Sequence, residues 1–549
     1  MSKNCDRLVV ITLIKGNFMN KKLLIGIIAG VVAIGAIIGG VVLLISSKEE
    51  DKKTSRFSEG LSFYLNQGGK SYSVSGIGTC IDTDIVIPSV YEGLPVTSID
   101  NGAFWNCTSL TSIEIPESVK YIGLSAFFRC SSLTSIVIPD SIISIGEWAF
   151  ECCTSLTYNE YDNAYYLGND ENPYVVLIKA KDTNITSCEI HEYTKIICDN
   201  AFYHCTSLTS IEMPDFVTSI GRDALSGCTS LTSIYIPNSV TSIGYGAFWG
   251  CTSLTSIVIP NSVTSIGVDA FYNCSSLTSI VIPDSVTNID SSSFSGCTSL
   301  IYNQYDNAYY LGNDENPYAI LIKAKDTNIT SCEIHENTKI ICPIAFSNCA
   351  SLSNIVVPDS VTSIGDSAFT VCKSLTSIVI PDSVTSIGYY AFYGCYSLIE
   401  VINKSSLNIV EGYSDYGDVG YYAKRIITDE SESAINFIGD YIFYDDGTEI
   451  YFVKYIGSDT EITLPEYDGG KEYGIYKHAF YKNDKITSVI IPDTVTSIGN
   501  YAFESCTSLT SINFEGSVEQ WNSITKGSRW NDYVPATEVI CSDGSVELN

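Results

Sequence analysis

Cysteine recurs every 23 residues along most of this chain of 549 residues. The longest unbroken run is at 205, 228, 251, 274 and 297, and each cysteine opens nearly the same segment, such as CTSLTSIVIPNSVTSIGVDAFYN. So short a unit cannot bury its own apolar face, and a fixed period of about 20–50 residues is typical of a solenoid with stacked turns. A solenoid is first of all a surface for binding.

One copy, residues 254–274, shows how a coil is built. Leu254, Ile257 and Ile259 have the i, i+3, i+5 spacing of a leucine-rich repeat, and the two isoleucines alternate with outward residues, as in a strand with one face inward. Pro260 has no backbone N–H to donate to a parallel ladder, so the strand ends there. A second short extended run and an Ala-Phe pair on a helical or irregular corner complete the coil.

The Ala-Phe pair allows the coils to be counted. Together with two degenerate copies it predicts about 13 coils of 23 residues. We therefore expect a mostly β leucine-rich repeat solenoid with short helical corners, inserted β-hairpins and an N-terminal transmembrane helix. The pairs begin at residues 103, 126, 149, 201, 247, 270, 345, 368, 391, 479 and 502.

The cysteines of the repeat are expected to be buried thiols. Twenty cysteines in a surface protein suggest a disulfide framework at first sight. Most of them, however, hold one fixed place in the repeat, where leucine-rich repeats put a small buried polar residue. Neighbouring coils are close enough for occasional cross-links, but the regular spacing favours reduced and buried side chains.

Three interruptions break the period. Two of them contain nearly identical text, and the extra residues near 159–181 and 303–325 read as β-hairpins around a GNDENP turn. The third, 401–478, contains DYIFYDDGTEIYFVKYIG at 440–457, whose Asp-Gly turn between aromatic strands is a strong hairpin signal.

These features divide the chain into eight parts, with ends that differ from the middle as solenoid caps do. The predicted parts are a cytoplasmic tail at 1–22, a transmembrane signal-anchor at 23–45, a linker at 46–60, an N-terminal cap at 61–100, the main array with its hairpins at 101–400, a β-rich insertion at 401–478, resumed repeats at 479–515 and a C-terminal cap at 516–549.

Residues 23–45 are apolar and uncharged, and a helix of about 20 such residues crosses a bilayer. Lys21 and Lys22 precede the segment, so the N-terminus is expected in the cytoplasm and the repeats outside the cell. No A-x-A cleavage site follows, which favours a retained signal-anchor over a cleaved signal peptide. Translation from Met19 instead of Met1 would leave a conventional export sequence.

Charge and motif content argue against nucleic acid and against catalysis. The formal net charge is −32 and no basic stripe is evident, so phosphate backbones would be repelled. His191 and His335 are each followed by Glu, but Lys195 and Lys339 stand where H-E-x-x-H requires its second histidine. No G-x-S-x-G occurs. We therefore predict no catalytic residues, no metal, no cofactor and no enzymatic activity.

Binding is expected where the repeats differ from one another or are interrupted. The candidates are the outward position of the first strand, the hairpins, and a run of aromatic residues at the corners, which alternatively pack against one another. We favour the strand position, because it is mostly valine and exposed apolar stripes often mark contact surfaces. Its residues are Glu114, Val137, Glu212, Tyr235, Val258, Val281, Val356 and Val379.

The pattern L-x-x-I-x-I-P-x-S-V-x-x-I-G-x-x-A-F-x-x-C, as at 254–274, resembles the BspA-like leucine-rich repeat family. The resemblance covers about 101–400 and 479–515. It implies a surface or secreted protein, since some members are adhesins, and it supplies no catalytic residues. LPEYDG at 464–469 lacks the threonine of a sorting signal, so attachment would depend on 23–45.

The sequence thus predicts a single-pass cell-surface protein that binds a protein or glycan on host or neighbouring cells. One alternative is a structural spacer of the cell envelope without a specific ligand. Another is a glycan-acting enzyme, which would need a pair of recessed carboxylates.

Overall fold

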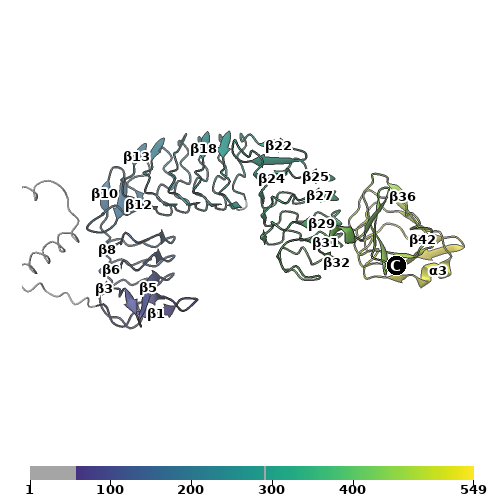
Figure 1. The fold of residues 1–549 in the computed structure, drawn as a ribbon, viewed down its shortest axis with the longest axis horizontal. Coiled ribbons are helices and arrows are strands. Elements are labelled where there is room, and N and C mark those ends of the chain that lie inside the picture. The colour runs from purple at the N-terminus through teal and green to yellow at the C-terminus, as the bar shows by residue number, and fades with distance from the viewer. Residues whose placement is uncertain (1–56, 290–291, 549) are drawn as a thin grey trace, which may run out of the picture. The chain divides into compact units, whose positions relative to one another are not determined.

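The computed structural model describes residues 57–548 except 290–291. The predicted transmembrane segment 23–45, the cytoplasmic tail and most of the linker lie outside these residues. Within them, short strands linked by turns repeat from coil to coil (Figure 1). The longest helix there, α3 (Val518–Ser523), has six residues, and no helix of this part has the length and apolar composition to cross a membrane.

A regular coil contributes one strand to each of two parallel ladders. β18 (Ser256–Val258) pairs in register with β20 (Ser279–Val281), so that Ile257 lies beside Ile280. The second strand of the same coil, β19 (Ser265–Ile266), pairs with β17 (Ser242–Ile243) of the coil before. A parallel stack of this kind satisfies the backbone groups of each coil with those of its neighbours.

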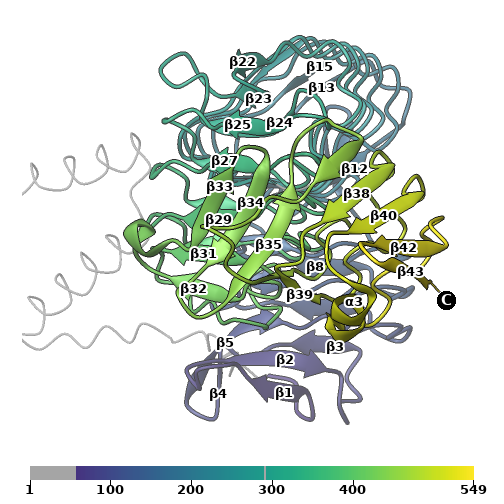
Figure 2. The same cartoon turned by 90° about the vertical axis from the view of Figure 1, so that its right-hand side faces the viewer.

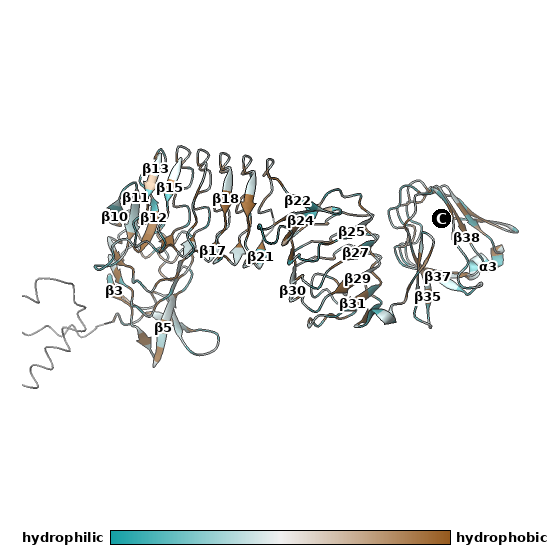
Figure 3. Ribbon diagram, turned by 45° about the horizontal axis from the view of Figure 1, so that its top comes forward, coloured by the Kyte–Doolittle hydropathy of each residue, from teal (hydrophilic) through white to brown (hydrophobic). Residues whose placement is uncertain are grey.

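The core lies between the two ladders and is made of the residues that recur. Ile257 and Phe271 are 2% and 0% exposed, and Leu254 is fully buried. The corner phenylalanines form a column, in which the rings of Phe248 and Phe271 stack with nearly parallel planes and centroids 5.3 Å apart. Figure 3 shows hydrophobic colour on β18, which contains Ile257 and Val258. Burial of such apolar area, about 25 cal/mol per Å², holds the stack together.

The corners are turns, and the prediction of short helical corners is wrong. Asp269 and Asn273 have φ of 56° and 58°, a left-handed conformation that ends any helical run within one turn. The corner amides instead donate to the next coil; the N–H of Phe248, for example, lies 2.8 Å from the carbonyl oxygen of Ala270. Apart from α3, the described residues contain one 3₁₀ helix, η1 (Glu430–Glu432).

The repeat cysteines are free thiols in the described part of the chain, and they are buried except for the half-buried Cys107, so the predicted burial is confirmed there. Burial raises the pKa of the Cys251 thiol to about 12. Nine of these thiols donate to the carbonyl of the corner residue in the preceding coil. The donors with this bond are Cys130, Cys153, Cys228, Cys251, Cys274, Cys297, Cys372, Cys395 and Cys506.

The first two insertions are integral to the stack. In the first, β10 (Asn159–Tyr161), β11 (Ala164–Leu167) and β12 (Val176–Ala180) form an antiparallel meander. β12 then pairs in parallel with β14 (Ile196–Ile197) of the next coil, and Leu177 is fully buried. The second insertion repeats this arrangement with β22 (Asn303–Tyr305), β23 (Ala308–Leu311), β24 (Ile320–Ala324) and β26 (Ile340–Ile341).

The third insertion also contributes a strand to the parallel ladder. β33 (Ile435–Ile438), β34 (Tyr441–Asp445) and β35 (Ile450–Tyr455) lie side by side in an antiparallel meander (Figure 2). β35 pairs in parallel with β37 (Tyr473–Ile475), where the repeats resume. The chain ends in the hairpin of β42 (Glu538–Cys541) and β43 (Gly544–Glu547).

The solenoid has about 20 turns of roughly 23 residues, more than the 13 coils predicted. The Ala-Phe count missed turns that lack this pair. The last strand of each insertion joins the ladder, as does β41 (Thr525–Lys526), which pairs with β39 (Val495–Ile498). A turn needs only a strand in register to extend a solenoid, and such strands are short.

Candidate binding surfaces

The predicted outward position lies on the first strand of each coil. Val258, Tyr235 and Val356 are 62%, 59% and 55% exposed, and Val137 is 41% exposed. The carboxylate-bearing Glu114 and Glu212 are exposed as well, whereas Val281 and Val379 are half-buried. The alternation with buried isoleucines follows from the two-residue period of a strand.

The structure brings some of these residues together and separates others. Glu114 pairs with Val137, and Val258 pairs with Val281, in register on neighbouring strands. The first-strand ladder is divided into several short sheets, so the eight positions do not form one continuous sheet. At Tyr235 the described ladder is reduced to the single bridge between Ser233 and Ser256.

Glu189 and Glu333 occupy the same outward register in the two insertion coils, although they are not among the predicted residues. Glu189 lies opposite Glu212, and Glu333 lies opposite Val356. In these two coils cysteine replaces the inward isoleucine, so their segment SCE differs from the SIE of other coils. The two segments align once the register of the strands is known. Like charges directly opposite on neighbouring strands repel.

Glu189 borders a hollow with an aromatic wall. The Tyr161 hydroxyl donates to Glu189 over 2.7 Å, and this hydrogen bond raises the pKa of Tyr161. The imidazole of His191 stacks on Tyr174 at 3.9 Å, and burial lowers the pKa of His191. The hollow has a volume of about 370 Å³ and is also lined by Glu192.

The corner aromatics are in contact with one another and also exposed. Trp105 and Phe128 lie 5.4 Å apart between centroids, as do Trp249 and Tyr272. Trp105 is nevertheless 57% exposed, and Tyr389 further along the chain is 80% exposed. Packing between successive corners therefore does not remove these rings from solvent.

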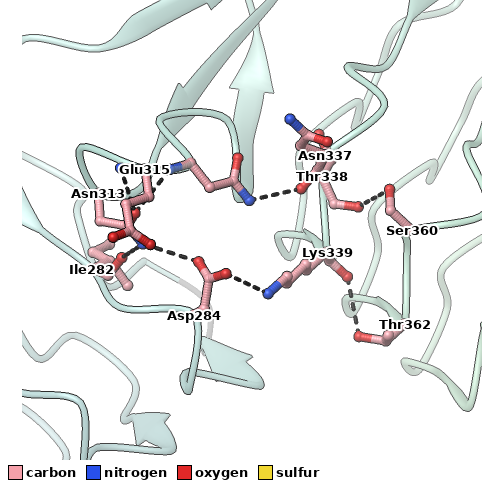
Figure 4. A network of polar contacts seen from close by, with 10 residues as sticks. Ile282, Asp284, Asn313, Glu315, Asn337, Thr338, Lys339, Ser360 and Thr362 are labelled. Atoms are coloured by element: carbon pink, nitrogen blue, oxygen red, sulfur yellow. Dashed lines mark hydrogen bonds and ion pairs between the residues drawn. The ribbon is translucent and has the colours of Figure 1, made fainter.

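A polar network ties each of the first two insertions to the flanking coils. In the second, Asp284 accepts from Asn313 at 2.9 Å and pairs with Lys339 at 2.7 Å (Figure 4). The hydrogen bond from Lys339 is the largest cause that lowers the pKa of Asp284. The Ile282 amide donates to Gly312 over 2.9 Å, so the insertion is joined to the preceding coil by its backbone as well.

On the corner side, both insertions leave a cleft. The first has a volume of about 420 Å³ and is lined by Trp148, Phe150, Tyr158 and Asp199 among others. Burial raises the pKa of Tyr158 to about 12 and that of Asp199 to about 6. The second, of about 500 Å³, lies at the equivalent place around Tyr302.

In the described part of the chain, no three His, Cys, Asp or Glu side chains are grouped so that they could hold a metal ion. In the GNDENP turn, a side-chain oxygen instead accepts hydrogen bonds from backbone amides. The side chain of Asn169 accepts from the amides of Glu171 and Asn172, at 3.0 and 2.8 Å. This use of asparagine is typical of a turn.

The chain is similar in sequence to bacterial leucine-rich repeat proteins of known structure. No curated protein matches the chain. A leucine-rich cell-surface protein from Faecalibacterium prausnitzii is 27% identical, with 86% of this chain and 97% of that chain covered and a TM-score of 0.25. A leucine-rich repeat protein from Bacteroides ovatus is 28% identical, with 62% and 93% covered and a TM-score of 0.26.

The family profile described as the BspA type leucine-rich repeat region matches six copies. Its matches include both hairpin insertions in part and continue to the C-terminal cap. They cover well over half of the chain, at residues 83–169, 180–301, 324–449 and 473–525. The chain therefore belongs to the BspA-type leucine-rich repeat family.

Proposed function

We propose that this chain is a cell-surface binding protein that recognises a protein or glycan of another cell through the outward face of its first strands. The observation that carries the proposal is the exposure of Val258 beside Val281 in the same register. The fold needs no apolar residue at this outward position, since glutamate occupies it in other coils, as at Glu114 and Glu212. Exposed apolar residues in a row are a feature of contact surfaces.

The surface location is part of the same proposal and depends on the apolar segment 23–45 and its lysine flank. Protease added to intact cells should remove the portion from 46 to 549, because the repeats would face outward. A mature N-terminus near Ser46 would instead mean that the apolar segment is a cleaved signal.

The insertions are the alternative location for the binding site, and their structure limits which of their side chains a partner can contact. Each hairpin turns some of its side chains into the core, with Tyr166 and Tyr310 fully buried. Its exposed residues include Asp170 and Glu171 of the turn in the first copy, and Glu160 on β10. An acidic turn binds by charge, whereas the valine face binds by apolar contact, so the salt dependence of binding separates the two.

The experiment that tests the function is an array of matrix proteins and glycans probed with the full-length protein in detergent. A saturable hit confirmed in solution supports a binding protein. If neither array nor pull-down from intact cells gives a saturable partner, the protein is better described as a structural spacer of the envelope.

A further inference from the structure

The corners of neighbouring coils are joined by three backbone hydrogen bonds. In the coil before the first insertion, the amides of Ser125, Phe127 and Arg129 donate to the carbonyls of residues 147, 149 and 151, at 2.8 to 3.0 Å. Every second amide of one corner thus donates a hydrogen bond to every second carbonyl of the next corner. A corner that is not followed by another corner therefore leaves three backbone amides without these acceptors.

At the first insertion these donors are open. The equivalent amides belong to Trp148, Phe150 and Cys152, and none of them has an acceptor among the described residues. The following turn supplies β12 to the ladder but no Ala-Phe corner, so the next corner begins only at residue 198. The cleft of about 420 Å³ lies in this gap, and its lining includes residues 148–153 and 198–200 together with Tyr158, Ile178 and Lys179.

The last coil of the chain shows what covers such an edge. Its amides at Tyr501, Phe503 and Ser505 donate to the carbonyls of Ser528, Trp530 and Asp532, at 3.0, 2.7 and 2.8 Å. The covering segment has the sequence SRWND at 528–532. A peptide with alternate carbonyls therefore completes a corner in this molecule.

Two side chains of the segment strengthen this contact. Arg529 pairs with Glu504 at 2.7 Å, and its guanidinium lies 5.6 Å from the ring centroid of Tyr501. Trp530 meets Phe503 edge-on at 6.1 Å. Glu504 is buried beneath the segment, since its side chain is 9% exposed.

The open edge of the first cleft carries the same three receiving groups at the same places in the repeat. Trp148 stands where Tyr501 stands, Phe150 corresponds to Phe503, and Glu151 to Glu504. Trp148 is 49% exposed, and Glu151 has no ion-pair partner in the described part of the chain. The second cleft lacks this set, because Ser295 replaces the glutamate.

We propose that the first cleft binds a peptide segment of a partner protein in which an arginine directly precedes an aromatic residue. The partner's alternate carbonyls accept from Trp148, Phe150 and Cys152, its arginine pairs with Glu151 over the Trp148 ring, and its aromatic side chain meets Phe150. Main-chain pairing supplies affinity and the two side chains supply specificity, as in strand-addition complexes. This surface lies at the corners, so it is separate from the outward strand face of the proposed function.

The test uses the peptide KGSRWNDY with blocked ends, which copies residues 526–533, titrated into the full-length protein in detergent. Saturable binding is expected, and a peptide with alanine in place of the arginine should bind at least tenfold more weakly, since hydrogen bonds to charged groups contribute about 1.5–3 kcal/mol. Glu151→Gln should weaken the unmodified peptide by a similar factor. Glu171→Gln, an exposed glutamate on the insertion turn, is the matched control and should change nothing.

Amide hydrogen exchange locates the peptide. Exchange across residues 148–152 should slow on binding, while residues 501–505 stay unchanged. Protection or exposure at 501–505 would mean that the peptide replaces the chain's own cap, which overturns the proposal. No saturable binding, or binding that is indifferent to both the arginine and Glu151, would overturn it too, provided that Glu151→Gln melts with the wild-type protein.

Discussion

The thiol of Cys274 donates a hydrogen bond to the carbonyl oxygen of Phe248, 3.1 Å away and one coil earlier. The same carbonyl accepts the amide of Cys251 at 3.1 Å, so a single oxygen links the corner of its own coil to the next. The cysteine is thus a small buried donor with a defined partner. This explains why its place is kept from coil to coil without a disulfide.

The corner phenylalanine should contribute more to stability than the cysteine beside it. Phe271→Ala should lower the free energy of unfolding by about 3–5 kcal/mol, because it removes a fully buried ring from a packed column. Cys274→Ser keeps a donor of similar size and should cost about 1 kcal/mol. Urea denaturation compares the two, with the exposed Ser256→Ala as the control. Equal costs would mean that the column of rings is not the main contact between coils.

Thiol reactivity should divide the cysteines by exposure. Cys152 is exposed and should react with a maleimide within minutes, while the buried thiols react only after denaturation. At Cys251 burial raises the pKa to about 12, so the reactive thiolate is scarce at neutral pH as well as inaccessible. Mass spectrometry after timed labelling gives the order. Extensive labelling of the repeat cysteines in the native protein, or their recovery as disulfides, would contradict the fold.

His478 should make the protein sensitive to mild acid. Its ring lies between Tyr396 and Tyr501, at 4.7 and 5.1 Å, and burial lowers its pKa from 6.5 to about 4. The unfolded chain therefore takes up this proton first as the pH falls, so stability is full above about pH 6.5 and is lost progressively down to about pH 4. His478→Phe keeps the stack and should remove this part of the loss.

The check for His478 is the difference between wild-type and variant unfolding free energies, measured from pH 7.5 to 4. The difference should change across this range in favour of the variant. A constant difference would show that the histidine titrates alike in the folded and unfolded chains.

The Asp284–Lys339 pair should stabilise the second insertion slightly. Asp284→Asn should cost about 0.5–1 kcal/mol at pH 7, because both partners are exposed to solvent. The pKa of Asp284 is lowered in the folded protein, so its contribution is present above the unfolded value near 3.8 and is lost as the pH falls through the folded value. Denaturation at pH 7 and pH 3 should therefore show a smaller cost of the substitution at pH 3 than at pH 7.

The first insertion offers the matched control for that pair. Lys195 donates there to the backbone carbonyl of Asp140, not to its carboxylate, at 2.6 Å. Asp140→Asn should then cost less than Asp284→Asn. An equal cost in both insertions would indicate that the lysine has no special role at Asp284.

The core could be read from the sequence because its residues recur. Ile257 and Phe271 are inward at positions that most coils share, and the proline that follows the strand marks its end. The corner conformation could not be read, since Ala-Phe is compatible with a helix and only the positive φ at Asp269 and Asn273 excludes it. Local propensity does not distinguish one helical turn from a row of β-turns.

The insertions were harder to predict than the repeats for a different reason. A hairpin signal at 159–181 reveals two strands but not that Val176 and Leu177 continue a parallel ladder with Ile196 and Ile197. Such pairing is a contact between distant segments and leaves no local pattern. The open corner at Trp148 follows from it, because a turn without an Ala-Phe corner leaves amides of the preceding coil without acceptors.

The central claim is that the outward strand face binds the partner. Its most direct test is the dissociation constant of the partner found by the arrays, measured for Tyr235→Lys, Val258→Glu, Val281→Glu in one variant. The matched control is Thr241→Lys, Thr264→Glu, Thr287→Glu, which adds the same charges at exposed positions of the second-strand ladder. We predict that the first variant weakens binding at least tenfold with an unchanged thermal melt, and that the control binds like the wild type. Undiminished binding by the first variant would contradict the claim.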